Sequence, residues 1–294
     1  MMRVNLPKPG TYVVAVSGGV DSVVLLNLLV RSGKYNLIVA HFDHGIRRDS
    51  SKDLMLVKSI AAKYGLDCVS GAGRLGAQAS EAVAREARYA FLMRTLQAKD
   101  ASAIITAHHR DDRLETMIIN LIRGSGRRGI AALAETALIK RPLLSVSKAD
   151  IKDYANQHKL SWREDSTNGD DRYLRNYIRH NILSRMSEAD KRRLIELIDH
   201  QADINRELDR LISKLVKTDT KLERKLIQGV GFNESKELIA YWLRGNNLIN
   251  FDRKTIERLT LAVKTKRPGT KLDVYNNASI LIDKQFLALT TLER

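Results

Sequence analysis

Two adjacent glycines followed by an acid and a serine make residues 17–22, SGGVDS, a candidate anion-binding loop. The apolar run 12–16 before the loop predicts a buried strand, and the run from residue 21 to about residue 31 predicts a helix. Gly18 and Gly19 permit a tight turn in which backbone N–H groups converge. The helix adds its own N-terminal N–H groups and the positive end of its dipole. We therefore expect a phosphate group to bind here.

Two carboxylates three residues apart mark a second candidate site. Asp112 and Glu115 follow the apolar run 101–107, which predicts a strand, and they share one face of the helix predicted over residues 111–123. Such a pair could bind an ammonium group or Mg²⁺, or it could simply cap and solvate the helix. Asp21 is the other candidate Mg²⁺ ligand, close to the anion-binding loop.

Histidines lie at the ends of two predicted strands. His41 is near the end of residues 36–43 and His44 directly follows them, while His108 and His109 follow residues 101–107. A zinc site at His41 and His44 is disfavoured, because no third or fourth soft ligand is spaced for one. Arg47 fits better as a contact to a phosphate or a base.

Arginines gather at three further places, where they could form surface salt bridges or bind a polyanion. Arg85 and Arg88 lie about one turn apart on a helix predicted over residues 80–98, with Ser80 as its N-cap. A second group is separated by glycines, which let backbone approach a phosphate, and a third group lies in RYLRNYIRHNIL (172–183). These two groups are Arg123, Arg127 and Arg128, and then Arg172, Arg175 and Arg179.

The elements that must position these residues alternate between strand and helix up to about residue 108. This alternation predicts an α/β fold, a parallel sheet with helices on both faces, whose strand ends carry the candidate sites. Residues 141–144 are expected to be a short extended piece, and residues 148–158 a helix. We expect a catalytic domain over residues 1–187, a helical linker over 188–220 and a small α+β domain over 221–294. The last of these should end in a hairpin that turns at Asn276 and Asn277.

Composition narrows the function classes. Fifty Lys and Arg against 34 Asp and Glu give a formal net charge of +16, which favours a nucleic-acid partner over a membrane surface. One cysteine, Cys68, excludes an intrachain disulfide or a cysteine-rich metal site. No signal peptide or membrane-spanning run is evident, so we expect a cytoplasmic protein, for which a homodimer is compatible with the sequence.

Several ordered motifs carry a family resemblance. SGGVDS after a first strand resembles the pyrophosphatase (PP) loop of the N-type ATP pyrophosphatases, and neither a Walker loop nor a dinucleotide fingerprint is present. Four more motifs extend the match: HFDHGIR (41–47), EAVAREARYAFL (81–92), TAHHRDDRLETMIINLIRGSGRRGIAAL (106–133) and EDSTNGDDRYLRNYIRHNIL (164–183). With them, the chain from about residue 12 to 185 closely resembles the tRNA(Ile)-lysidine synthetases.

That resemblance implies an adenine nucleotide alpha hydrolase-like fold and a ligase that uses ATP and Mg²⁺. The ligase would attach lysine to C2 of the wobble cytidine in the CAU anticodon of an isoleucine tRNA, through an adenylated cytidine, releasing AMP and pyrophosphate. The expected ATP-binding residues are Ser17, Gly18, Gly19, Val20, Asp21, Ser22, His41, Arg47 and His108. The expected lysine-binding residues are Asp112 and Glu115, and the expected tRNA-binding residues are Arg85, Arg88, Arg123, Arg127, Arg128 and Arg172. Catalysis is expected of Asp21, Asp112, Glu115, Arg175 and Arg179, although the last two could serve tRNA binding alone.

The chain departs from the family pattern in three respects. Arg113 stands where the family usually has Gln, Ser184 stands where it often has Pro, and larger members carry more C-terminal sequence. Two rival functions stay open: a tRNA-modifying pyrophosphatase that takes sulfur from elsewhere, and a basic RNA-binding protein that retains an ATP loop. Few aromatic side chains are available to stack on the wobble base; Tyr89, Phe91 and Tyr173 are the candidates.

Overall fold

The computed structural model describes residues 4–45, 50–73, 76, 81–131, 133–164, 171–217, 219–248, 251–275 and 278–291. The chain divides into two compact units, Met1–Asp199 and His200–Arg294. The division falls inside one helix, α8 (Glu188–Ile212). Among the described residues, no helix combines the length and apolar character needed to span a membrane.

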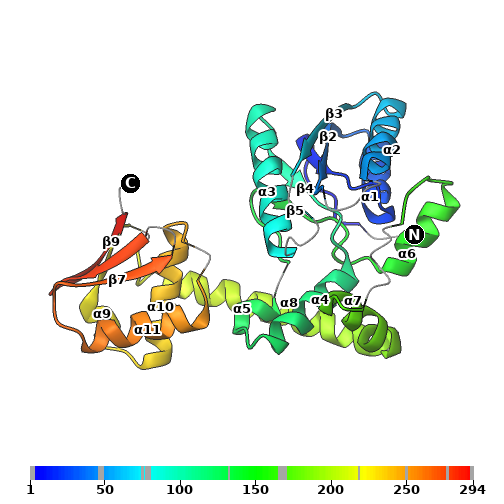
Figure 1. Ribbon diagram of the computed structural model, residues 1–294. Helices are drawn as coiled ribbons and strands as arrows, with labels where there is room; N and C mark the ends of the chain where they lie inside the picture. The colour runs from blue at the N-terminus through cyan, green and yellow to red at the C-terminus, as the bar shows by residue number, and fades with distance from the viewer. Residues whose placement is uncertain are drawn as a thin grey trace. The chain divides into compact units, whose positions relative to one another are not determined.

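A five-stranded parallel sheet organises the first unit (Figure 1). The strands are β1 (Gly10–Ala15), β2 (Tyr35–Asp43), β3 (Asp67–Ala72), β4 (Ala103–Ile105) and β5 (Ile139–Lys140), in the spatial order β3-β2-β1-β4-β5. The chain builds outward from β1 in one direction and then crosses to β4 on its other side. A crevice therefore opens beyond the carboxyl ends of β1 and β4, where open α/β sheets bind ligands.

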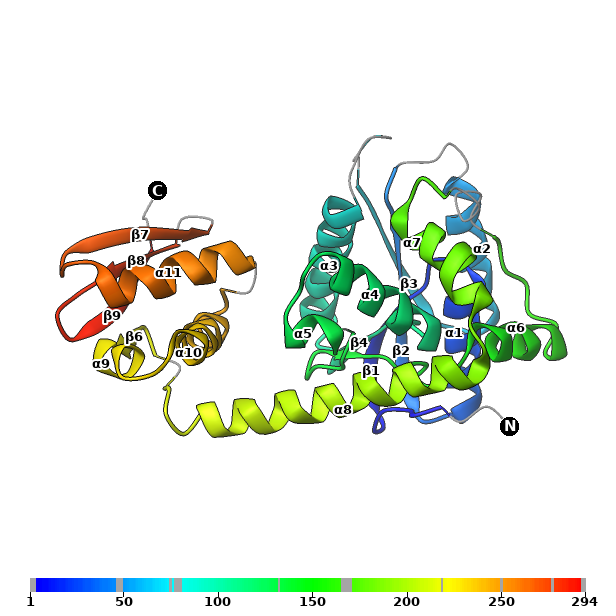
Figure 2. The same ribbon diagram turned by 90° about the horizontal axis from the view of Figure 1, so that it is seen from below.

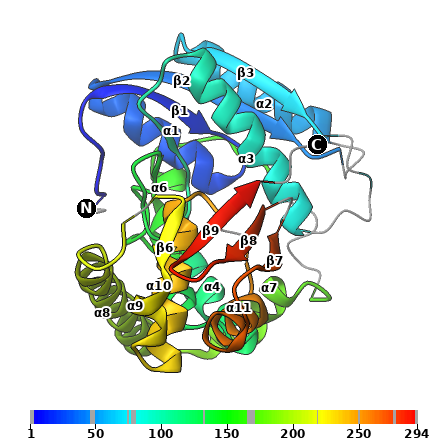
Figure 3. The same ribbon diagram turned by 90° about the vertical axis from the view of Figure 1, so that its left-hand side faces the viewer.

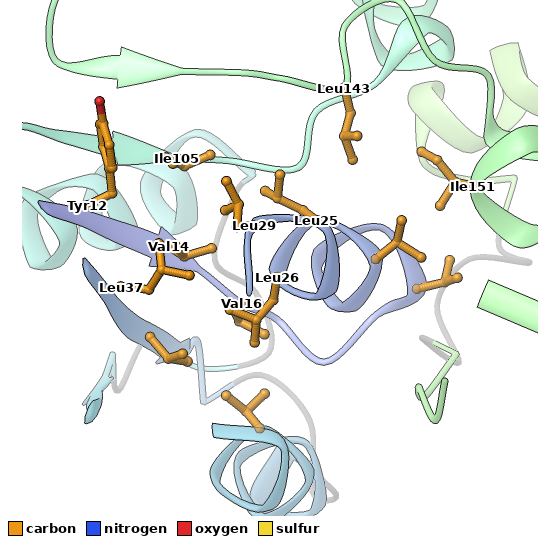
Figure 4. Packing of buried hydrophobic residues seen from close by; sticks show 14 of the residues in the cluster. Tyr12, Val14, Val16, Leu25, Leu26, Leu29, Leu37, Ile105, Leu143 and Ile151 are labelled. Atoms are coloured by element: carbon orange, nitrogen blue, oxygen red, sulfur yellow. The ribbon is translucent and has the colours of Figure 1, made fainter. Parts of the chain in front are cut away.

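Side chains of alternate strand residues supply both faces of this sheet. Val14 and Val39 face α1 (Val20–Ser32), α2 (Ser50–Lys63) and α6 (Lys148–Gln157), while Val13, Ile38 and Ile104 face α3 (Glu81–Ala98). Figure 4 shows Leu25, Leu26 and Leu29 of α1 beside Val14, Val16 and Ile105. This two-sided burial confirms the predicted fold class and explains why the strands read as continuous apolar runs.

The extended piece expected at residues 141–144 is wrong. The strand ends at Lys140, and two turns follow, in which Leu144 N donates to Arg141 O at 3.2 Å and Val146 N to Leu143 O at 2.9 Å. Leu143 is fully buried against α1 and α6, so its apolar character reflects turn packing rather than a strand.

Helices form the rest of the first unit, and Figure 2 shows α4 and α7 near the sheet above α8. They are α4 (Arg110–Ile122), α5 (Arg127–Ile130), α7 (Leu174–Tyr177), the π-helical turn η2 (Ile178–Ile182), the 3₁₀ turn η3 (Leu183–Arg185) and the start of α8. Leu114, Met117, Ile178, Leu183 and Ile198 form their common core. The chain passes from α to π to 3₁₀ geometry across α7, η2 and η3, and such π turns often occur at functional sites.

The second unit is a small α+β domain with an antiparallel sheet, as predicted. Its sheet has the order β6 (Lys221–Glu223), β9 (Phe286–Thr291), β8 (Ala278–Ile282) and β7 (Thr270–Tyr275), which can be followed in Figure 3. The helices α9 (Arg224–Gln228), α10 (Phe232–Gly245) and α11 (Arg253–Thr265) pack with it around the fully buried Trp242. The expected turn at residues 276 and 277 lies outside the described residues.

One buried guanidinium ties three segments of this small domain together. Arg224 donates to Val263 O at 3.1 Å and to Lys266 O at 2.5 Å, at the end of α11, and to Asp283 O at 3.2 Å, in the turn between β8 and β9. These bonds satisfy carbonyl groups that the end of a helix leaves without intrahelical partners.

We predict that Arg224→Met destabilises the second unit by about 3 kcal/mol, because the carbonyl groups of Val263, Lys266 and Asp283 lose the donor that binds them. Lys225→Met, which removes the same charge from an exposed neighbour on α9, should change stability by less than about 0.5 kcal/mol. Urea unfolding of both variants, followed by tryptophan fluorescence, measures the difference. Equal midpoints for the two variants would contradict the role given to Arg224.

Candidate active site

The loop between β1 and α1 folds as an anion cradle. Gly18 has a φ of +92°, a backbone conformation that favours glycine, and Gly19 is the N-cap of α1. Ser22 Oγ donates to Gly19 O at 2.9 Å and accepts from Ser17 N at 3.2 Å, so the serines hold the loop closed. The first N–H groups of α1, which have no intrahelical partners, are thereby presented beyond β1.

A cavity of about 590 Å³ joins this loop to the two carboxylates of α4. From the loop it is lined by Ser17, Gly19, Val20 and Asp21, and from α4 by Asp112 and Glu115. Lys148 at the start of α6 and Arg179 and His180 of η2 complete the part of the wall discussed below. Residues that follow β1, β4 and β5 therefore meet residues of the later helices at the strand-end crevice.

Asp21 and Asp112 approach each other across the ring of His109. His109 Nε2 lies 3.7 Å from Asp21 Oδ1 and 3.6 Å from Asp112 Oδ2, and the ring is buried. Asp112 Oδ2 also accepts from His109 N at 2.9 Å, which fixes the carboxylate in the first turn of α4. Two anionic groups thus face the same part of the cavity, an arrangement suited to a cation.

Lys148 forms an ion pair with Asp21. Its Nζ donates to both Asp21 oxygens, at 2.6 and 2.7 Å, while its backbone N donates to Asp111 Oδ2 at 2.9 Å. Asp111 therefore joins the start of α4 to the start of α6 and sets the reach of the lysine. Sequence reasoning missed Lys148, although the residue follows the N-cap Ser147 in the segment after the sheet's fifth strand, and the strand-end rule points to such segments.

Glu115 is the most deeply buried charge of the site. Its side chain is 0% exposed, and its two oxygens accept from Arg179 Nε at 2.7 Å and Arg179 Nη2 at 3.1 Å. Arg175 Nη1 lies 3.4 Å from the same carboxylate. Burial raises the pKa of Glu115, while the bonds from Arg179 oppose that shift and favour the carboxylate. The site therefore pairs Glu115 with arginine, whereas Asp112 keeps its carboxylate directed toward Asp21 and His109.

His108 lies outside the cavity lining in an arginine-rich setting. Its Nδ1 is 2.9 Å from Thr106 Oγ1, and the guanidinium groups of Arg85 and Arg88 lie over the Tyr89 ring, 4.7 and 5.6 Å from its centroid. Burial lowers the pKa of His108 well below its usual 6.5, and the positive charges of Arg141, Arg88 and Arg85 lower it further. His108 is accordingly neutral at pH 7.

The other predicted residues that the structure describes do not line the cavity. His41 is buried, with Nδ1 2.8 Å from Val16 O, so it contacts the residue directly before the loop. Arg123 is exposed, and Arg127 and Arg128 are half-buried beside Gly129, where an added Cβ would come within 2.4 Å of Ser125 Cβ. Arg172 is exposed as well. The predicted contact Arg47 and the predicted cap Ser80 lie outside the described residues.

The unusual Arg113 has a clear structural partner. It is buried on α4, and its guanidinium donates to Asp199 of α8. A neighbouring pair, Arg110 Nη2 to Glu188 Oε2 at 2.7 Å, joins the same two helices. Arg113 therefore fastens the helix that carries Asp112 and Glu115.

We predict that the His108 ring titrates well below pH 6.5 in an NMR titration of its carbon-bound protons. The unfolded chain takes up this proton near pH 6.5 whereas the folded chain does not, so folding stability should fall as the pH drops below about 6.5. His108→Gln should flatten that part of the stability curve. A His108 ring that titrates at or above 6.5 would contradict the neutral state.

Comparison with known proteins identifies the domain that carries this site. The family profile described as "PP-loop domain" matches residues 3–186. The likeness to a U34-tRNA thiolase structure from Methanococcus maripaludis, with a TM-score of 0.54 and 17% identity over 66% of this chain and 73% of that one, is a likeness of fold alone.

Curated relatives cover more of the sequence. The tRNA(Ile)-lysidine synthase of Methylococcus capsulatus is 34% identical over 87% of this chain and 63% of its own length. That of Francisella tularensis subsp. holarctica is 30% identical over 93% of this chain and 72% of its own length. The chain spans only 48% of the relative from Solibacter usitatus. From the profile match together with the extent of these alignments, the chain belongs to the tRNA(Ile)-lysidine synthase family of PP-loop proteins.

Proposed function

We propose that this protein ligates lysine to C2 of the wobble cytidine in the CAU anticodon of an isoleucine tRNA, with ATP as the energy source. The observation that carries the proposal is the single cavity that holds both the Ser17–Asp21 loop wall and the carboxylates of α4. A phosphate cradle and an ammonium-binding carboxylate are the two recognition elements that such a ligase must bring together.

In the first step, the C2 carbonyl oxygen of the cytidine attacks the α-phosphorus of ATP, and pyrophosphate leaves. The backbone N–H groups at Gly18, Gly19 and Val20 and the start of α1 would hold the polyphosphate. Arg179 uses Nε and Nη2 on Glu115, which leaves Nη1 to bind the phosphoryl group as charge develops on it. Glu115 thus serves chiefly as a positioning residue for Arg179.

Lys148 is the second cation that we assign to this step. ATP brings several negative charges next to the Asp21 carboxylate. The Lys148 ammonium group would bind the departing pyrophosphate and, at the same time, neutralise the charge of Asp21. Asp21 stays our candidate Mg²⁺ ligand, because proteins often bind Mg²⁺ through one or two carboxylates together with substrate phosphates. Lys148 Nζ holds both Asp21 oxygens, so it would have to release one of them to the ion. Bound there, Mg²⁺ would neutralise the charge of the phosphates.

In the second step, the deprotonated ε-amine of lysine attacks C2, the C2–O bond breaks, and AMP leaves. Asp112 is the carboxylate best placed to bind the incoming ammonium group, because its oxygens do not accept from arginine in the contacts described above. The lysine-binding role predicted for Glu115 is secondary in this proposal, since Arg179 occupies both of its oxygens.

Binding of tRNA is the remaining part of the proposal. The net charge of +16 supports a polyanionic partner, and Arg85, Arg88, Arg123, Arg127, Arg128 and Arg172 stay our candidates for its phosphates. The rival sulfur-transfer function gains no support from Cys68. That residue lies on β3 away from the cavity lining, and burial raises the pKa of its thiol. The homodimer stays a prediction.

The direct test mixes the purified protein with Mg·ATP, radiolabelled lysine and an isoleucine tRNA transcript that bears a CAU anticodon. We expect ATP-dependent label in this RNA and none in a methionine tRNA with the same anticodon. Pyrophosphate release without label would retain the adenylation step and reject lysine as the nucleophile. Neither signal would reject the proposal.

Two substitutions should separate the two steps. Asp112→Asn should raise the KM for lysine about tenfold or more, because it removes a charge-assisted contact, and leave tRNA-dependent pyrophosphate release within about threefold. Lys148→Met should instead slow pyrophosphate release about tenfold or more, because Asp21 then faces the phosphates unpaired. Lys152→Met, on the cavity wall without an Asp21 contact, is the control for Lys148. The reverse pattern of effects would reject the assignment.

A further inference from the structure

Two exposed tyrosines, Tyr173 and Tyr177, are the N-cap and the last residue of α7. The side chains of Tyr173 and Tyr177 are 56% and 48% exposed, and Leu174 between them is 40% exposed. Tyr177 N donates to Tyr173 O at 3.0 Å, so the two residues are separated by one helical turn and share a face. Single exposed apolar residues are ordinary, but two large aromatic rings on one turn form a patch that indicates a partner.

The opposite face of the same turn belongs to the active site. Asn176 and Ile178 are buried, and Arg175 and Arg179 reach Glu115 at 3.4 and 2.7 Å. Arg179 and His180, which continue the helix, line the cavity. The exposed tyrosine face therefore lies within one turn of the cavity wall, on a helix whose inner face is fixed by the site.

Charge identifies the kind of partner. Residues 172–194 contain seven Lys and Arg against two acids, Glu188 and Asp190. The nearby Asp171 is engaged, because its carboxylate lies 2.6 Å from His180 Nδ1 and accepts from Asn181 Nδ2 at 3.0 Å. An aromatic patch set in a cationic segment suits single-stranded nucleic acid, whose bases stack on rings while its phosphates pair with arginine.

We propose that Tyr173 and Tyr177 form a stacking surface for the unpaired anticodon-loop bases that flank the wobble cytidine. This inference rests on the proposed function, which places that cytidine in the adjoining cavity. Anticodon-loop bases are unpaired and can be splayed out of their stack, so rings beside the cavity can hold the neighbours of the base that enters. The surface would contribute substrate affinity and orientation, with no part in the chemical steps.

The test measures binding of a 17-nucleotide anticodon stem-loop that carries 2-aminopurine beside the wobble cytidine. In the Tyr173→Leu/Tyr177→Leu variant we expect the Kd to rise about tenfold, the size of effect typical of losing stacking on a base. The stacking-dependent quenching of 2-aminopurine should disappear as well. The Tyr173→Phe/Tyr177→Phe variant keeps both rings, so its Kd should stay within about twofold of wild type.

Further measurements separate stacking from other causes. The slope of log Kd against log salt should be unchanged in the leucine variant, because no charge is lost. The affinity for ATP should be unchanged too, because neither tyrosine lines the cavity. Phe232→Leu, which removes an exposed ring from α10, is the matched control and should bind the stem-loop as wild type does.

The outcomes distinguish this inference from the proposed function. If wild type binds the stem-loop and the leucine variant binds it equally well, the stacking surface is rejected and the proposed function stands. If the phenylalanine variant loses as much affinity as the leucine variant, the hydroxyl groups bind and stacking is rejected. If wild type transfers no lysine and does not bind the stem-loop, the proposed function fails and this inference fails with it.

Discussion

The buried carboxylate of Glu115 is the constraint on which the architecture of the site depends. A carboxylate removed from water is stable only when cations and hydrogen bonds surround it, and both cations come from a segment some sixty residues further along the chain. The pairing therefore fixes α7 and η2 against α4. It also fixes Arg179, which lies on the π-helical turn, at the cavity.

The parallel sheet also helps to position charged groups at the cavity. Its strand order opens a crevice at β1 and β4, and the helices that begin there direct N–H groups toward bound anions. Asp111 illustrates how closely the parts are coupled, because one carboxylate holds the start of α6 and thereby sets Lys148 on Asp21. Charged groups of both signs therefore line one cavity, Asp21, Asp112 and Glu115 together with Lys148 and Arg179.

The elements of the first unit could be predicted from the sequence, because two-sided burial leaves long apolar runs and glycine marks the turn at residue 18. Asp21, Asp112 and Glu115 could be placed at strand ends for the same reason. The partner of each charge could not be predicted. Whether Glu115 meets a ligand or Arg179, and whether Asp21 meets Lys148, depends on packing between segments far apart in sequence. Local patterns also misassigned residues 141–144, since a buried turn and a short strand have similar compositions.

The pair formed by Arg113 and Asp199 bears on how this protein can be recombined with its relatives. Residue 113 lies within the PP-loop domain match at 3–186, whereas its partner lies beyond that match, at the last position of the first unit. A chimera joined at the end of the domain match would keep Arg113 from one protein and take position 199 from the other. The buried arginine would then face a residue that was not selected to pair with it. Exchange of C-terminal units among family members should therefore be made after residue 199, so that the ion pair is inherited as one block.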